Sequence, residues 1–138
     1  MPDLHTLDHI ALAVRDVAAS AAWYADVLGL KRVHADVWGD VPTMMAAGND
    51  TMLALFPVKV APGSDPKPPP GKDVIAMRHF AFRTDRAGFE QAQTHLRDRG
   101  IEFRCEDHTI AHSIYFHDLD GHKVEITTYD LQAARSET

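Results

Sequence analysis

The hydrophobic pattern near the start of the chain changes from the period of a strand to that of a helix. In residues 7–14, LDHIALAV, bulky aliphatic residues alternate with small or polar ones. This alternation predicts a strand with His9 on the face opposite the bulky side chains. Asp16 can cap a helix over residues 17–28, whose apolar residues recur at helical spacing, and Gly29 can end it. A strand followed by a helix is therefore expected.

Three further runs in the first half of the chain have the composition of strands. Turn-forming residues at 39–40 and 48–50 separate them. The runs are residues 30–38, 41–48 and 51–58. The first half therefore predicts the order strand, helix, three strands.

The second half of the chain repeats this order. Residues 76–84, AMRHFAFRT, predict a strand with His79 on the face opposite two phenylalanines. Asp85 can cap a helix over residues 86–99. Three more strand-like runs follow, at residues 101–107, 112–118 and 123–130. Between the halves, residues 58–74 hold five of the eight prolines and have no periodicity, which is typical of a connector.

The repeated order, with His9 and His79 separated by 70 residues, predicts two similar modules related by a pseudo-twofold axis. Each module is too small to bury its own sheet face well. We therefore expect an α+β fold in which two βαβββ modules form a concave mixed sheet, with the helices outside and both histidines lining the concavity. The expected organisation is a single domain, 1–138, with module one at about 5–57, the connector at 58–74 and module two at about 75–130.

Composition and charge narrow the range of partners. The 138-residue chain is 45% hydrophobic and 25% charged, which is ordinary for a globular domain. Its net charge is −6 and its 14 lysines and arginines are scattered, which argues against nucleic acid or an anionic membrane and favours a small-molecule substrate. The N-terminal segment resembles neither a signal sequence nor a membrane span, so we expect a cytoplasmic protein. Cys105, the single cysteine, excludes an internal disulfide and is expected to be a half-buried strand residue.

Glu125 adds a third potential metal ligand to the two histidines. Strand alternation places it on one face with Lys123, whose side chain is expected to reach solvent. A carboxylate inside a strand of β-branched residues is costly unless it is paired or bound to a cation. Two imidazoles and one carboxylate form a facial set that binds a divalent metal and leaves coordination positions open. We therefore predict His9, His79 and Glu125 as metal ligands.

The sequence resembles the vicinal oxygen chelate superfamily, which includes glyoxalase I, fosfomycin-resistance proteins, methylmalonyl-CoA epimerase, extradiol dioxygenases and bleomycin-resistance proteins. The resemblance runs from LDHIALAVRDVAASAAWYADVLGL at residues 7–30 to SIYFHDLDGHKVEITTYD at residues 113–130. It implies paired βαβββ modules and maps the metal ligands of the superfamily onto His9, His79 and Glu125. Modules of this superfamily can also pair between chains, and exposed strand edges predict a homodimer.

A fourth protein ligand is not expected. Glu125 lies four residues after Gly121, and the same count from Gly48 reaches Met52, at which the resemblance implies Glu or Gln in glyoxalase I and the epimerase. A methionine thioether is a poor ligand for a hard or borderline divalent ion. A three-ligand site resembles that of the fosfomycin-resistance proteins and extradiol dioxygenases, with Fe²⁺ or Mn²⁺ favoured and Zn²⁺, Ni²⁺ or Co²⁺ as alternatives.

Tyr115 and His117 are the predicted catalytic residues. Tyr115 lies ten residues before Glu125, a context shared with extradiol enzymes, in which the tyrosine at the matching position contacts the metal-bound catecholate. His117 shares a strand face with Tyr115 by alternation and is expected to move protons. His108 and His112, in the preceding loop, are the alternatives for proton transfer.

The resemblance implies a metal-dependent enzyme that chelates its substrate through vicinal oxygens. We favour extradiol-type dioxygenation of a catechol-like small molecule, because the site has three protein ligands and Tyr115. One alternative is thiol transfer to, or hydrolysis of, an epoxide such as fosfomycin, with Arg78, Arg83 and Arg104 as candidate phosphonate-binding residues. A glyoxalase I-like lyase is another. A ligand-sequestering protein of the bleomycin-resistance kind would not need the three metal ligands.

Overall fold

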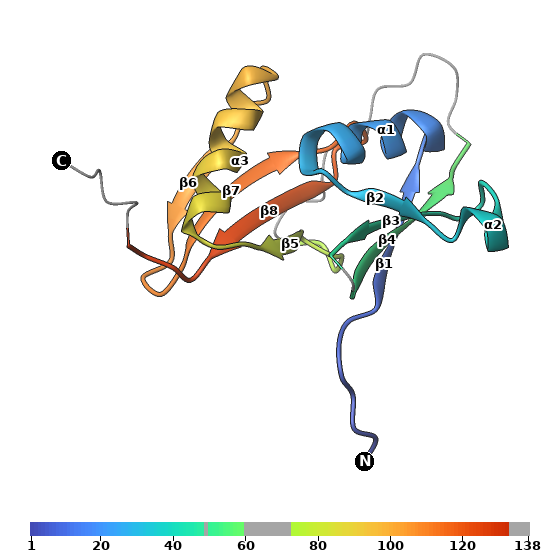
Figure 1. Cartoon of the computed structure of the whole chain (residues 1–138), viewed down its shortest axis with the longest axis horizontal. Coiled ribbons are helices and arrows are strands. Elements are labelled where there is room, and N and C mark those ends of the chain that lie inside the picture. Colours follow the sequence, from blue (N-terminus) through green and yellow to red (C-terminus); the bar gives the residue numbers. More distant parts are fainter. Residues whose placement is uncertain (49, 60–72, 133–138) are drawn as a thin grey trace. The chain divides into compact units, whose positions relative to one another are not determined.

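The computed structural model describes residues 1–48, 50–59 and 73–132. The chain forms two compact units, Met1–Asp65 and Pro66–Thr138, which Figure 1 colours from blue to green and from yellow to red. Most of the predicted connector, residues 60–72, lies outside the described residues. Each unit contains one four-stranded mixed sheet, which confirms the α+β class and the repeat.

The first unit has the strand order β1-β4-β3-β2. Strand β1 runs parallel to β4, and the remaining neighbours are antiparallel. Its elements are β1 (His9–Val14), α1 (Val17–Leu28), β2 (Lys31–Val33), α2 (Ala35–Trp38), β3 (Thr43–Ala47) and β4 (Thr51–Pro57). The chain segment that connects the parallel strands β1 and β4 contains helix α1, as in a βαβ crossover.

The second unit repeats this arrangement with the order β5-β8-β7-β6. Strand β5 is parallel to β8, whereas β7 is antiparallel to both of its neighbours. Its elements are β5 (Phe80–Arg83), α3 (Arg86–Asp98), β6 (Arg104–Asp107), β7 (His112–His117) and β8 (Lys123–Thr128). Figure 1 shows α3 lying along one face of this sheet.

Both long helices begin at the predicted caps. The Asp16 carboxylate accepts a hydrogen bond of 3.0 Å from the Ala19 amide, and the Asp85 carboxylate accepts one of 2.8 Å from the Gly88 amide. Each bond satisfies an amide that the first helical turn leaves without a partner. Helix α1 ends at Gly29, whose φ of 67° lies in the left-handed region that favours glycine.

The core of each unit lies between its long helix and one face of its sheet. In the first unit, α1 packs on β3 and β4; buried side chains there are Leu12, Val14, Tyr24, Val27, Leu53 and Leu55. In the second unit, α3 packs on β8; buried side chains there are Phe80, Phe89, Leu96, Val124 and Ile126. Strand alternation therefore leaves the opposite sheet face for His9 and Glu125.

All the predicted strands are shorter in the structure, and two of them differ most from their predicted bounds. The run at 30–38 forms a strand only as far as Val33, because His34 adopts a left-handed conformation with a φ of 60° and a short helix follows. The run at 76–84 becomes a strand only from Phe80, so His79 directly precedes β5. Cys105 does lie in a strand, β6, but it is exposed instead of half-buried. Among the described residues, no helix is long and apolar enough to cross a membrane.

Candidate metal centre

His79 and Glu125 meet on the sheet of the second unit. The parallel ladder pairs Ala81 with Glu125, and His79 lies two residues before Ala81. His79 Nε2 is 2.9 Å from Glu125 Oε1. The Glu125 side chain is 10% exposed and that of His79 is 33% exposed. A buried carboxylate thus points one oxygen at an imidazole nitrogen that solvent can still reach.

Ser113 holds the other oxygen of the same carboxylate. Its hydroxyl donates a buried hydrogen bond of 2.7 Å to Glu125 Oε2. Thr127, the ladder partner of Ser113, places its own hydroxyl oxygen 3.0 Å from Ser113 Oγ. These contacts orient the carboxylate and leave Oε1 as the atom that faces His79.

The chemistry of this pair fits a divalent metal. In the described part of the chain, Glu125 has no ion pair with a lysine or arginine. A protonated imidazole or a bound cation would balance its buried negative charge directly. Bonds of about 2.1 Å from nitrogen and oxygen to one ion, at a right angle, would separate the two donor atoms by about 3 Å. The 2.9 Å distance suits such chelation as well as it suits a hydrogen bond.

The described residues contain no group of three His, Cys, Asp or Glu side chains that could hold a metal by themselves. Their own unit therefore brings together only two of the three predicted ligands, His79 and Glu125. The third predicted ligand, His9, belongs to the first unit.

His9 is the first residue of β1 and lies on the face opposite Leu12 and Val14, as predicted. Its side chain is 47% exposed. His9 Nδ1 lies 2.8 Å from Asp8 Oδ2. With the proton on Nδ1, this contact orients the ring and leaves the lone pair of Nε2 available to a metal, the arrangement that carboxylates commonly impose on ligating histidines.

The residue that corresponds to Glu125 in the first unit is Ala54, not Met52. Ala81 pairs with Glu125 in the second parallel ladder, and Ala11, two residues after His9, pairs with Ala54 in the first. Met52 instead pairs with His9. The count from the turn glycine was therefore wrong by two positions. The expectation that the first unit supplies no fourth protein ligand is unchanged, because an alanine side chain has no atom that binds a metal.

Tyr115 lies beside the pair, directly opposite Glu125 in the β7–β8 ladder. Its ring meets the His79 ring edge to face, with centroids 5.4 Å apart and an interplanar angle of 86°. Burial, followed by the negative charge of Glu125, raises the pKa of the Tyr115 phenol above its ordinary value of 10.0. The phenol is therefore neutral at physiological pH and can act as a hydrogen-bond donor.

His108 lies at hydrogen-bonding distance from the Tyr115 hydroxyl. His108 Nε2 lies 2.8 Å from the Tyr115 hydroxyl oxygen and 3.6 Å from Glu106 Oε2. A tight turn makes this contact, because Thr109 adopts a φ of 72° and the His108 amide donates to the Ala111 carbonyl at 2.8 Å. A β-branched residue rarely adopts a positive φ, so the sequence alone does not signal this turn.

Within the described residues, the other two candidate histidines form no hydrogen bond with Tyr115. His117, the ladder partner of Lys123 at the end of β7, is exposed, and its side chain has no hydrogen bond or ion pair there, so its catalytic role stays a prediction. His112 Nδ1 accepts a hydrogen bond of 2.7 Å from Arg86, which also donates to the Asp130 carbonyl. His112 thus connects β7 to the start of α3.

A profile of the Glyoxalase/Bleomycin resistance protein/Dioxygenase superfamily matches residues 6–126, a span that contains all three predicted ligands. The chain belongs to this superfamily. Membership agrees with the resemblance found in the sequence and with the two repeated sheets.

Members and solved structures similar to this chain carry different activities in their names. A metallothiol transferase FosB from Staphylococcus epidermidis is 32% identical over 129 residues, covering 91% of this chain and 85% of that protein. Biphenyl-2,3-diol 1,2-dioxygenase 3 from Rhodococcus globerulus is 30% identical over 125 residues, covering 87% of this chain and 61% of that protein. The structure of a glyoxalase/dioxygenase from Nostoc punctiforme has a TM-score of 0.76 at 28% identity and covers 94% of both chains.

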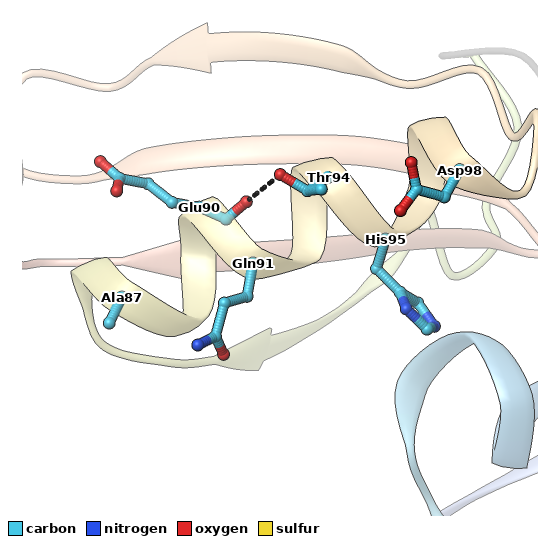
Figure 2. A pocket seen from close by; sticks show the side chains of 6 residues that line it. All are labelled: Ala87, Glu90, Gln91, Thr94, His95 and Asp98. Atoms are coloured by element: carbon cyan, nitrogen blue, oxygen red, sulfur yellow. Dashed lines mark hydrogen bonds between the residues drawn. The ribbon is translucent and has the colours of Figure 1, made fainter.

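A hollow on the exposed stripe of α3 is separate from the predicted metal ligands. Figure 2 shows its lining, which comes from one stripe of the helix. The lining residues are Ala87, Glu90, Gln91, Thr94, His95 and Asp98. The hydroxyl of Thr94 donates to the carbonyl of Glu90 at 3.4 Å, within the helix itself. The hollow thus includes neither His79 nor Glu125 and is a solvent-facing helix surface.

Proposed function

We propose that this protein is an enzyme that depends on a divalent metal held by His9, His79 and Glu125. The observation that carries the proposal is the buried Glu125 carboxylate, with one oxygen held by Ser113 and the other 2.9 Å from His79 Nε2. The Asp8 contact, which leaves His9 Nε2 available, supports His9 as the third ligand. Imidazole and carboxylate suit Fe²⁺ or Mn²⁺, which we favour, and also Zn²⁺, Ni²⁺ or Co²⁺.

When bound, the metal would supply Lewis acidity and a template for two adjacent substrate oxygens. The residues of the chain would orient the substrate and would donate and accept protons. If His108 donates its Nε2 proton to the Tyr115 oxygen, the Tyr115 O–H is free to donate to a substrate oxygen. Tyr115 is then the substrate-contacting residue, and His108 sets the direction of its hydrogen bond.

For the reaction, we propose transfer of a thiol to an electrophilic small molecule such as an epoxide. Relatives named metallothiol transferase match this chain over 80% or more of their own length, whereas the dioxygenase matches over 61% of its length. In such a reaction the sulfur bonds to a ring carbon, the carbon–oxygen bond breaks, and the oxygen takes up a proton. Tyr115 would stabilise the negative charge that develops on this oxygen.

Extradiol cleavage of a catechol, which the sequence favoured, is the second candidate. The observation in its favour is the 2.8 Å contact between the Tyr115 hydroxyl and His108 Nε2, beside the His79 ring. A phenol and an imidazole so close together can take a proton from a catechol and return it later.

Metal content tests the proposal that both reactions share. Protein purified without chelator should contain about one divalent ion per chain, and the ion should be lost from His79→Ala and Glu125→Gln proteins. The exposed residues His5 and Glu102 provide matched controls, since His5→Ala and Glu102→Gln should keep the ion. A metal-free wild-type protein that binds a small molecule tightly would instead indicate a ligand-sequestering protein.

Two activity assays separate the reactions. Metal-loaded protein is incubated with a thiol and fosfomycin, and the adduct is measured by mass spectrometry. In parallel, protein loaded anaerobically with Fe²⁺ is given catechols and then air, and the coloured ring-cleavage product is followed by absorbance. Adduct without colour supports thiol transfer, and colour without adduct would move the assignment to the dioxygenase.

We also propose a cytoplasmic homodimer. The sheets of the two units end in strands β1 and β2 and in β5 and β6, and edge strands offer unpaired backbone groups to a second copy. Sedimentation of the purified chain should give about twice the monomer mass. His9 would then come from the same chain as Glu125 or from the second copy, as module exchange permits.

A further inference from the structure

The Lys123 side chain, which was expected to reach solvent, lies over the ring of Tyr115. Its Nζ is 4.8 Å from the ring centroid. Lys123 precedes Glu125 by two residues on β8, so both side chains project from the same face of the sheet. The side chain is half-buried. The ammonium group therefore places a positive charge beside Tyr115, the ladder partner of Glu125.

Within the described residues this charge has no acidic partner, because Lys123 forms no salt bridge there and its ammonium lies against the Tyr115 ring. A second cation, Arg104, also faces this ring, with Cζ 5.7 Å from the centroid. Arg104 is paired, because its guanidinium lies 2.7 Å from Glu106 Oε1. Of the two cations, Lys123 is the one whose charge is available to a ligand.

The charge balance of the site calls for an anion. A divalent ion, the Glu125 carboxylate and the Lys123 ammonium sum to a net charge of about two positive units when the histidines are neutral. A metal bound by the predicted ligands and the Lys123 ammonium would repel each other, and an anion that contacts both would relieve that repulsion. The Tyr115 face keeps the ammonium in position while a ligand is absent.

We propose that Lys123 binds an oxyanion of the substrate, a phosphonate, phosphate or carboxylate group, next to the oxygens that chelate the metal. Arg104 contributes less to anion binding, because its guanidinium already forms an ion pair with Glu106. The assignment rests on the proposed metal site and names the class of substrate that this site accepts. It makes Lys123 a residue that determines specificity, while Tyr115 contacts the reacting oxygen.

Calorimetric titration of the zinc-loaded protein with methylphosphonate tests the assignment. The Lys123→Met variant should bind about tenfold more weakly than wild type and the Arg104→Met variant about twofold more weakly, whereas Lys123→Arg should stay within about twofold. Lys31→Met, an exposed lysine of β2, is the matched control and should bind as wild type does. A parallel titration with acetate distinguishes the anions, because tighter phosphonate binding indicates a phosphonate or phosphate substrate and tighter acetate binding a carboxylate.

Zinc content measured on the same samples distinguishes failure of the proposed metal site from failure of the proposed anion-binding role of Lys123. Wild-type protein without zinc contradicts the metal site itself. Zinc-loaded Lys123→Met protein that binds methylphosphonate within about twofold of wild type would overturn only the role of Lys123. Loss of zinc from Lys123→Met, or no methylphosphonate binding by zinc-loaded wild type at millimolar concentration, would overturn it too.

Discussion

Ser113 and Glu125 are joined by a buried hydrogen bond of 2.7 Å between neighbouring antiparallel strands. The bond occupies one oxygen of the carboxylate and turns the other toward His79. A buried carboxylate that could rotate would bind a metal less tightly, because binding would first have to order it. Ser113 is therefore the positioning residue of the candidate metal centre, and it was not among the residues predicted for the site.

Replacing Ser113 by alanine should weaken both the metal site and the fold. The Glu125 Oε2 atom would lose a partner in a buried position, which costs about 1–3 kcal/mol of the free energy of unfolding. We expect zinc affinity to fall by about 10- to 100-fold. A competitive chelator titration measures the affinity, and urea unfolding measures the stability.

Ser20 is the matched control for Ser113. It is also buried, at 1% exposure, but its hydroxyl has no hydrogen-bond partner within the described residues. Ser20→Ala should leave zinc affinity unchanged and should keep or increase stability, because it removes an unsatisfied polar group. Equal effects of the two substitutions would refute the special role of Ser113.

Removing the Tyr115 hydroxyl should reduce turnover without removing the metal. In Tyr115→Phe the ring that contacts His79 and Lys123 remains, but the donor to the substrate is lost. We expect kcat to fall by about 10²- to 10³-fold in whichever of the two assays is active. Zinc content should match wild type, and Tyr129→Phe, at an exposed tyrosine, should be fully active. A Tyr115→Phe enzyme with normal kcat would exclude the phenol from the chemistry.

The metal-free protein should lose stability in alkaline solution through Tyr115. The folded phenol has a pKa above the value of 10.0 expected for the unfolded chain, because of burial and Glu125. The contribution of the neutral phenol is thus fully present below about pH 10 and is lost as the pH rises through the folded pKa. Urea unfolding at pH 8 and pH 11 should show a larger decrease for wild type than for Tyr115→Phe. Identical decreases would contradict the raised pKa.

The helix caps can be tested apart from the site. Asp16→Ala removes the acceptor for the Ala19 amide at the start of α1 and should lower the free energy of unfolding by about 1 kcal/mol. Asp98, at the last residue of α3, offers a control with the opposite sign. Asp98→Ala should have no effect or a slight stabilising one, because a negative charge at a helix C-terminus is unfavourable. Thermal and urea unfolding report both, and a neutral Asp16→Ala would show that this cap contributes nothing.

The sequence by itself determined the features that depend on neighbouring residues. The alternation around His9, the helix signals at Asp16 and Asp85, and the turn residues all act within a few positions, so they identify the elements and their order. The repeat and its motifs were enough for the superfamily. Local signals also have limits, as the short helix after His34 shows, because a residue at positive φ ended a run that looked like a strand.

The tertiary structure alone decided which residues of distant segments face each other. Counting from Gly48 pointed to Met52, but the glycines of the two connections lie at different distances from the first ladder residues, and the parallel strand register assigns Ala54. The contact of His108 with Tyr115 depends on the positive φ of Thr109. Strand register and turn conformation are set by packing and hydrogen bonds between segments far apart in the sequence. The contacts of Ser113 with Glu125, and of His108 and Lys123 with Tyr115, therefore became visible only in the folded chain.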